Sequence, residues 1–162
     1  MAAWTTAVKT WATETLTSTL LNAQLKDFAN SFGPWGSYGS GSSWTASTTN
    51  PTLGNGTWSA KYRQTQKTID FNIVLTIGST TTFGSGLYAF ALPVTPATDF
   101  CCSVILLDSS AGQRYSGTAW CTVAGGVNRL IFGSGTAGAT GTSPVALATG
   151  DQIIVSGTYE AA

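Results

Sequence analysis

Few side chains in this sequence could carry catalytic chemistry, and histidine is missing altogether. The chain therefore lacks the usual general base, the most common metal ligand and the ordinary pH switch. Two converging carboxylates among Asp70, Asp99, Asp108 and Asp151 could in principle cleave a glycosidic bond. However, Asp108 precedes Ser-Ser-Ala-Gly and Asp151 follows a glycine, which is typical of turn residues that accept hydrogen bonds from backbone amides. We therefore expect no catalytic residue and no enzymatic activity.

The three cysteines cannot all pair within one chain and show no zinc-ligand spacing. Reduced thiols are the simplest interpretation, and no metal site is expected. Cys101 and Cys102 are adjacent in an apolar strand, so one should lie in the core and the other should face a second layer or a subunit. The Gly-Ser-Gly runs at residues 84–86 and 133–135 lack the Gly-Lys-Ser/Thr ending of a phosphate loop, and no cofactor is expected.

Aromatic residues are frequent in the expected strands and could form a platform on which sugar rings stack. The candidate ligand surface consists of Trp44, Tyr88, Tyr115 and Trp120. The alternative is that these alternating strand positions belong to the core or to a subunit contact. A host-surface glycan is therefore a candidate partner, and carbohydrate binding is one functional hypothesis.

The charge composition of the chain argues against nucleic acid and membranes as partners. Only 9% of the 162 residues are charged, and seven Lys and Arg balance seven Asp and Glu. No net field would draw such a chain to nucleic acid or to an anionic membrane. No segment approaches the roughly 18 consecutive apolar residues that cross a bilayer, and the first nine residues do not resemble a secretory signal. We expect synthesis in a cytoplasm and neither nucleic acid nor membrane as a partner.

The elements that position these residues change character near Gly33. Before it, four apolar residues recur at intervals of four, three and four, which predicts a helix over residues 17–32. They are Leu21, Leu25, Phe28 and Phe32. This spacing is also the seam of a coiled coil, so the stripe either packs on its own domain or is buried between copies or against a larger assembly. Trp4 and Trp11 precede the helix and are candidate anchors to a partner, or they pack locally.

A Gly/Ser-rich linker is expected at residues 34–43, and beyond it the apolar period becomes two. Turn signals separate the expected strands, and residues 133–141 are expected to form a mobile loop. The predicted fold class is mainly β, an antiparallel, jelly-roll-like sandwich at residues 44–162, preceded by an arm and a helix at residues 1–33. Strands are expected at residues 43–48, 58–63, 69–77, 87–92, 100–107, 115–123, 127–132 and 152–159.

Short motifs along nearly the whole chain resemble one family, the small fiber, decoration and minor tail proteins of tailed bacteriophages, particularly those infecting actinobacteria. The arm and helix are similar to the virion-attachment segment of these proteins, in the motifs WTT at residues 4–6, KTWA at 9–12 and LLNAQLKD at 20–27. The β region is similar to their carboxy-terminal sandwich, in the motifs NPTLGNGT at residues 50–57, LPV at 92–94 and GDQI at 150–153.

The resemblance implies a non-enzymatic homotrimer on the surface of a virion. Its amino-terminal segment would bind the major capsid protein or a tail protein, and its sandwich would project. Head decoration or a head fiber is the first hypothesis. The alternative is a minor tail or tail-fiber protein that binds a receptor, or a carbohydrate-binding module. The oligomer and attachment interface would include Trp4, Trp11, Leu21, Leu25, Phe28 and Phe32.

Overall fold

A computed structural model of the chain describes residues 18–31, 33–123, 127–132 and 138–162. The helix α1 spans Ser18–Ser31, and a short 3-10 turn, η1, spans Gly41–Ser43. The strands are β1 Gly36–Ser37, β2 Trp44–Ala46, β3 Thr57–Thr65, β4 Thr68–Thr76, β5 Tyr88–Ala91, β6 Phe100–Asp108, β7 Gln113–Thr122, β8 Val127–Phe132 and β9 Gln152–Glu160.

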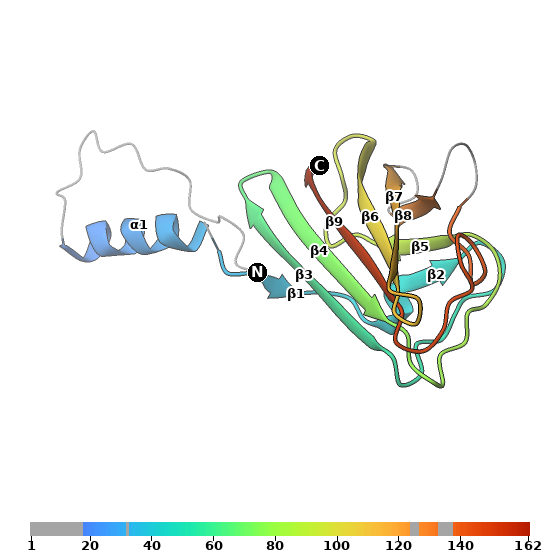
Figure 1. Ribbon diagram of the computed structural model, residues 1–162. Helices are drawn as coiled ribbons and strands as arrows, with labels where there is room; N and C mark the ends of the chain where they lie inside the picture. Colours follow the sequence, from blue (N-terminus) through green and yellow to red (C-terminus); the bar gives the residue numbers. More distant parts are fainter. Residues whose placement is uncertain (1–17, 32, 124–126, 133–137) are drawn as a thin grey trace.

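These strands pair in the order β1-β3-β4-β9-β6-β7-β8-β5-β2, and every pair is antiparallel. The sheet curls so that its two ends face each other across the core (Figure 1). Trp58 of β3 contacts Phe90 of β5 with ring centroids 5.3 Å apart, although the two strands lie near opposite ends of the strand order. The mainly β, antiparallel sandwich predicted from the sequence is therefore confirmed. Because β9 inserts between β4 and β6, the sandwich is not a simple meander.

Alternation along the central strands builds the core. In β4, Ile69, Phe71, Ile73 and Leu75 are at most 2% exposed, while the residues between them are half-buried. The neighbouring strands β9 and β6 direct their own alternate aliphatic residues to the same side. Aliphatic side chains at every second position fill one face of a pleated strand, so this pattern forces one side of the sheet inward.

Two segments differ from the sequence expectations. Residues 34–43, predicted to be a linker, include β1, which pairs with β3, and Tyr38, which packs against the core. Ala139 lies in the segment predicted to be a mobile loop, but it is fully buried and its carbonyl accepts a 2.8 Å hydrogen bond from the Tyr88 amide. In both segments a bulky or apolar side chain finds a place against the sandwich, which composition alone does not show. Residues 133–137 of that loop lie outside the described residues.

The helix α1 stands away from the sheet in Figure 1 and joins it through residues 33–35. Its bounds fall within the range expected from the apolar spacing, and residues 17 and 32 lie outside the described residues. Among the described helices, none combines the length and the apolar character needed to cross a membrane.

Candidate functional site

The helix α1 presents uncovered leucines. Leu21 and Leu25 are 42% and 57% exposed, and their spacing of four residues places them on one face of the helix. Of the other residues predicted for this interface, Trp4, Trp11 and Phe32 lie outside the described residues, as does the side chain of Phe28. Among residues 18–31, 33–123, 127–132 and 138–162, none covers these two leucines fully.

Trp35, which follows α1 in the sequence, contacts the outside of the sandwich. The Trp35 ring lies 5.6 Å from the Arg63 guanidinium carbon, in a cation–π contact. Arg63 Nε donates a 2.8 Å hydrogen bond to Asp70, and the Thr158 hydroxyl donates one of 2.6 Å to the same carboxylate. The Thr158 bond first, and then the Arg63 bond, lower the pKa of Asp70 below its ordinary value. These contacts link Trp35 to β3, β4 and β9 on the outside of the sandwich.

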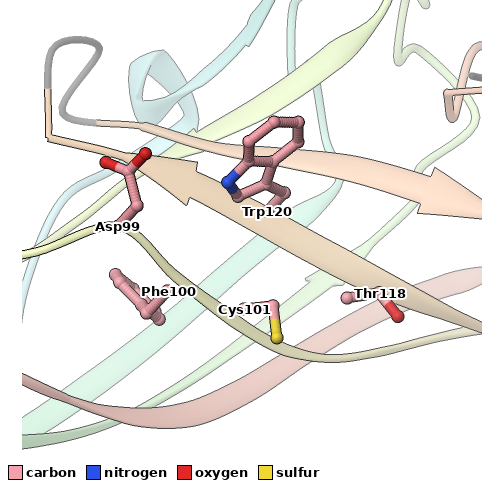
Figure 2. A pocket seen from close by; sticks show the side chains of 5 residues that line it. All are labelled: Asp99, Phe100, Cys101, Thr118 and Trp120. Atoms are coloured by element: carbon pink, nitrogen blue, oxygen red, sulfur yellow. The ribbon is translucent and has the colours of Figure 1, made fainter.

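An open groove lies where β6 begins and β7 ends (Figure 2). It is a shallow, largely open hollow of about 450 Å³. Trp120 is 52% exposed beside it, and the indole nitrogen is on the side nearer Asp99. Cys101 pairs directly with Trp120 across the two strands. The lining residues are Asp99, Phe100, Cys101, Thr118 and Trp120.

The groove is held in place by contacts on both sides of the sheet. The Phe100 ring stacks on Tyr159 with centroids 4.7 Å apart and planes at 14°. One oxygen of Asp99 accepts a 2.8 Å hydrogen bond from the Val123 amide. An aromatic face beside a carboxylate and the Thr118 hydroxyl can hold a sugar, because the ring stacks on C–H groups while the oxygens bond to hydroxyls.

The predicted ligand surface is wrong for two of its four aromatic residues. Trp44 and Tyr88 are 1% and 0% exposed, and their rings meet edge-to-face in the core at 5.1 Å. The Tyr88 hydroxyl donates its hydrogen bond to the Phe83 carbonyl rather than to a ligand. Tyr115 is half-buried and packs against the core. These residues occupy inward positions of a curled sheet, and of the four only Trp120 reaches the groove.

Asp108 and Asp151 are turn residues, as the sequence predicted. Asp108 accepts hydrogen bonds from the amides of Ala111 and Ser110 and from the Ser110 hydroxyl; these contacts, that of Ala111 foremost, lower the pKa of Asp108. Asp151 is 1% exposed and accepts amide hydrogen bonds from Ser109 and Ala148 at 2.9 and 2.8 Å. Both carboxylates are thus used by the fold. Nowhere in the described parts of the chain do three Cys, Asp or Glu side chains gather as metal ligands.

The adjacent cysteines point to opposite faces, as expected for a strand. Cys102 is buried and burial raises its pKa to about 12, whereas Cys101 is exposed at the groove. Cys121 is buried as well, and burial raises its pKa to about 11. A buried thiol with a raised pKa is a poor nucleophile, so neither Cys102 nor Cys121 is suited to covalent catalysis.

Sequence reasoning missed Asp99 and Thr118 as groove residues and Ile105 as an exposed aliphatic. Ile105 lies in an unbroken apolar run, which gives no sign of which member faces out. Asp99 immediately precedes β6 and Thr118 lies on β7, so only the pairing of β6 with β7 brings these two residues together. No family model, curated protein or solved structure matches the chain.

Proposed function

We propose that this chain is a non-enzymatic structural protein of a tailed-phage virion, acting as a homotrimeric capsid decoration or head-fiber protein. Residues 1–33 would bind the particle, and the sandwich of residues 44–162 would face outward. The observation that carries the proposal is the exposure of Leu21 and Leu25 on a helix that precedes a sandwich with a complete core of its own. Motifs in the same segment resemble a virion-attachment segment.

Energetics favour a partner for α1. A helix of 14 residues is marginal in water when isolated. Burying a leucine side chain contributes about 1.5–3 kcal/mol. Burying Leu21 and Leu25 between copies would therefore contribute favourable free energy that a marginally stable isolated helix does not have. The same contact would link the copies to one another and leave the sandwiches projecting.

The chemistry of the sandwich fits a structural role. The carboxylates Asp108 and Asp151 satisfy backbone amides in turns, and Asp70 is bonded to Arg63 and Thr158. Balanced charge lets many copies crowd on one particle with little mutual repulsion. Serine and threonine on the exposed strand positions keep the surface hydrated without adding charge.

The mass of the full chain in solution tests the proposal. Light scattering coupled to gel filtration should give three times 16.7 kDa at micromolar concentration. Leu25→Lys should reduce that mass, because a lysine cannot be buried in the helix seam without a partner. The matched control Thr19→Lys changes another exposed helix residue and should leave the assembly intact. A monodisperse wild-type monomer would contradict the proposal.

A second candidate function, saccharide binding, is favoured by the groove at Trp120. Titration with a glycan panel should quench or shift tryptophan fluorescence, and Trp120→Ala should abolish that change. Trp35→Ala is the matched control, because Trp35 is also exposed but lies outside the groove. Binding that survives in Trp120→Ala, or the absence of any signal across the panel, would remove this candidate.

A further inference from the structure

Asn55 is followed by Gly56, and this pair can undergo a spontaneous covalent change. The backbone nitrogen of Gly56 can attack the side-chain amide carbon of Asn55, because glycine has no side chain to hinder the approach. The other asparagines precede Ala, Ser, Pro, Ile or Arg, which crowd the following nitrogen or, at proline, remove its proton. Asn55 is therefore the residue of this chain that is most prone to deamidation.

The reaction has two steps. In the first, a C–N bond forms between the Gly56 nitrogen and Asn55 Cγ, and Nδ2 leaves as ammonia with the proton that the Gly56 nitrogen gives up. The product is a five-membered succinimide. In the second step, water opens the ring at either carbonyl and gives aspartate or isoaspartate. Isoaspartate adds one carbon atom to the main chain, so a tight turn that contains it cannot keep its geometry.

The structure restrains the attacking nitrogen. Residues 53–56 form a turn in which the Gly56 amide donates a 3.0 Å hydrogen bond to the Leu53 carbonyl, and this bond is lost when the nitrogen gives up its proton. Gly78 packs directly against the reacting pair, since a Cβ built on Gly78 would collide with both Asn55 Oδ1 and the Gly56 nitrogen. Such close packing leaves the two reacting groups little room to move.

Four hydrogen bonds hold Asn55 to residues 79–80, at the end of the sandwich where β3 begins and β4 ends (Figure 1). Asn55 Oδ1 accepts one from the Thr80 amide at 2.9 Å and one from the Thr80 hydroxyl at 3.0 Å. Asn55 Nδ2 donates one to the Ser79 hydroxyl at 3.0 Å, and the Asn55 amide donates one to the Thr80 hydroxyl at 2.9 Å. We call these four bonds the Asn55 clamp. Ring closure moves Cγ onto the Gly56 nitrogen and expels Nδ2, so the side-chain bonds of the clamp must break first.

We propose that Asn55 is a deamidation site that the Asn55 clamp keeps unreactive in the folded chain. Modification then takes place only in molecules whose turn at residues 53–56 has opened, and isoaspartate prevents that turn from closing again. The modification thus marks each chain that has opened at this end of the sandwich. The inference depends neither on the homotrimer nor on the groove at Trp120.

Mass spectrometry of the full chain, incubated at mildly alkaline pH, measures the conversion of amide to acid, and peptide fragmentation locates it. Folded wild type should deamidate at Asn55 at least about tenfold more slowly than the same chain in guanidinium chloride, because the rate follows the open fraction.

Two variants test the clamp in the folded state. Thr80→Val removes the hydroxyl that takes part in two bonds of the clamp, and it should deamidate at least about threefold faster than wild type. Thr82→Val is the matched control, because Thr82 is also an exposed threonine of this loop but its hydroxyl bonds to that of Thr52 at 2.6 Å. Ser79→Ala removes only the acceptor of Asn55 Nδ2 and takes the place of Thr80→Val if that variant does not fold.

Slow conversion in folded wild type, with acceleration in Thr80→Val and none in Thr82→Val, supports the inference. Equal rates in folded and unfolded wild type overturn it, as does faster conversion at another asparagine in denaturant. It is also overturned if Thr80→Val is no faster than Thr82→Val, and a Thr80→Val slower than wild type would show that the hydroxyl activates the amide instead. If Ser79→Ala has to be used, a rate equal to that of Thr82→Val has the same meaning.

Discussion

The two faces of the sheet formed by β4, β9 and β6 differ in burial, although the same strands build both. On the inner face Ile73, Val155 and Val104 are at most 1% exposed, because the curled sheet closes over them. On the outer face Ile105 is 38% exposed, and Val74 and Ile154 are half-buried. Similar residue types one position apart therefore differ in their surroundings: the inner set is buried in the single chain, and the outer set stays in partial contact with water.

The largest expected effect is a difference in unfolding free energy between substitutions on the inner face and on the outer face. Ile73→Ala removes a fully buried side chain and should lower the free energy of unfolding by about 2–5 kcal/mol. Ile105→Ala should cost less than about 1 kcal/mol in the dissociated chain, since part of that side chain already meets water. Urea unfolding at low protein concentration measures both. Equal losses would show that the two faces are not distinct in the single chain.

The adjacent residues Cys101 and Cys102 lie on opposite faces, so their thiols should differ in reactivity. Cys101 should react with a disulfide reagent at pH 8 at least about 100-fold faster than Cys102 or Cys121, because burial limits access to those two and raises their pKa. One thiol should titrate in the native chain and three in denaturant. The variant Cys101→Ser should remove the fast phase, and a fast phase that persists would place a second thiol at the surface.

Substitution of Asp151, whose carboxylate accepts amide hydrogen bonds in a turn, should lower stability less than Ile73→Ala does. Asp151→Ala leaves the amides of Ser109 and Ala148 without their carboxylate acceptor, at a cost of about 1–3 kcal/mol. Glu160→Ala, at an exposed position of β9, is the control and should change stability by less than about 0.5 kcal/mol. Thermal unfolding of the two variants compares them, and similar melting temperatures would contradict the buried role of Asp151.

The smallest expected effect is the pH dependence of the stability that Asp70 contributes on the outer face. The pKa of Asp70 lies below its unfolded value of 3.8, so its carboxylate stabilises the fold fully above that value. The contribution is lost as pH falls through the lowered folded pKa. Wild type should therefore exceed Asp70→Asn in urea midpoint at pH 7, and the difference should shrink as the pH is lowered below 3.8. A difference that stays constant as the pH is lowered would show that ionisation of Asp70 is not involved.

Much of this arrangement could be predicted from particular residues. Alternation in residues 69–77 predicted the central strand, and the adjacent cysteines were expected on opposite faces. Asp108 and Asp151 were recognised as turn residues by the serines and glycines beside them. These predictions depend on interactions within a few positions along the chain, which local sequence specifies. The attachment role of the arm and helix stays a prediction.

The sequence by itself determined the period of two, and with it which residues share a face of each strand. It could not determine which face another layer would cover, because that depends on how the sheet curls and on which distant strands meet. Trp44 and Trp120 both read as aromatic strand positions, yet the first packs on Tyr88 in the core and the second borders the groove. Burial depends on partners far apart in the chain, so only the tertiary structure decided that Trp44 is a core residue and Trp120 an exposed one.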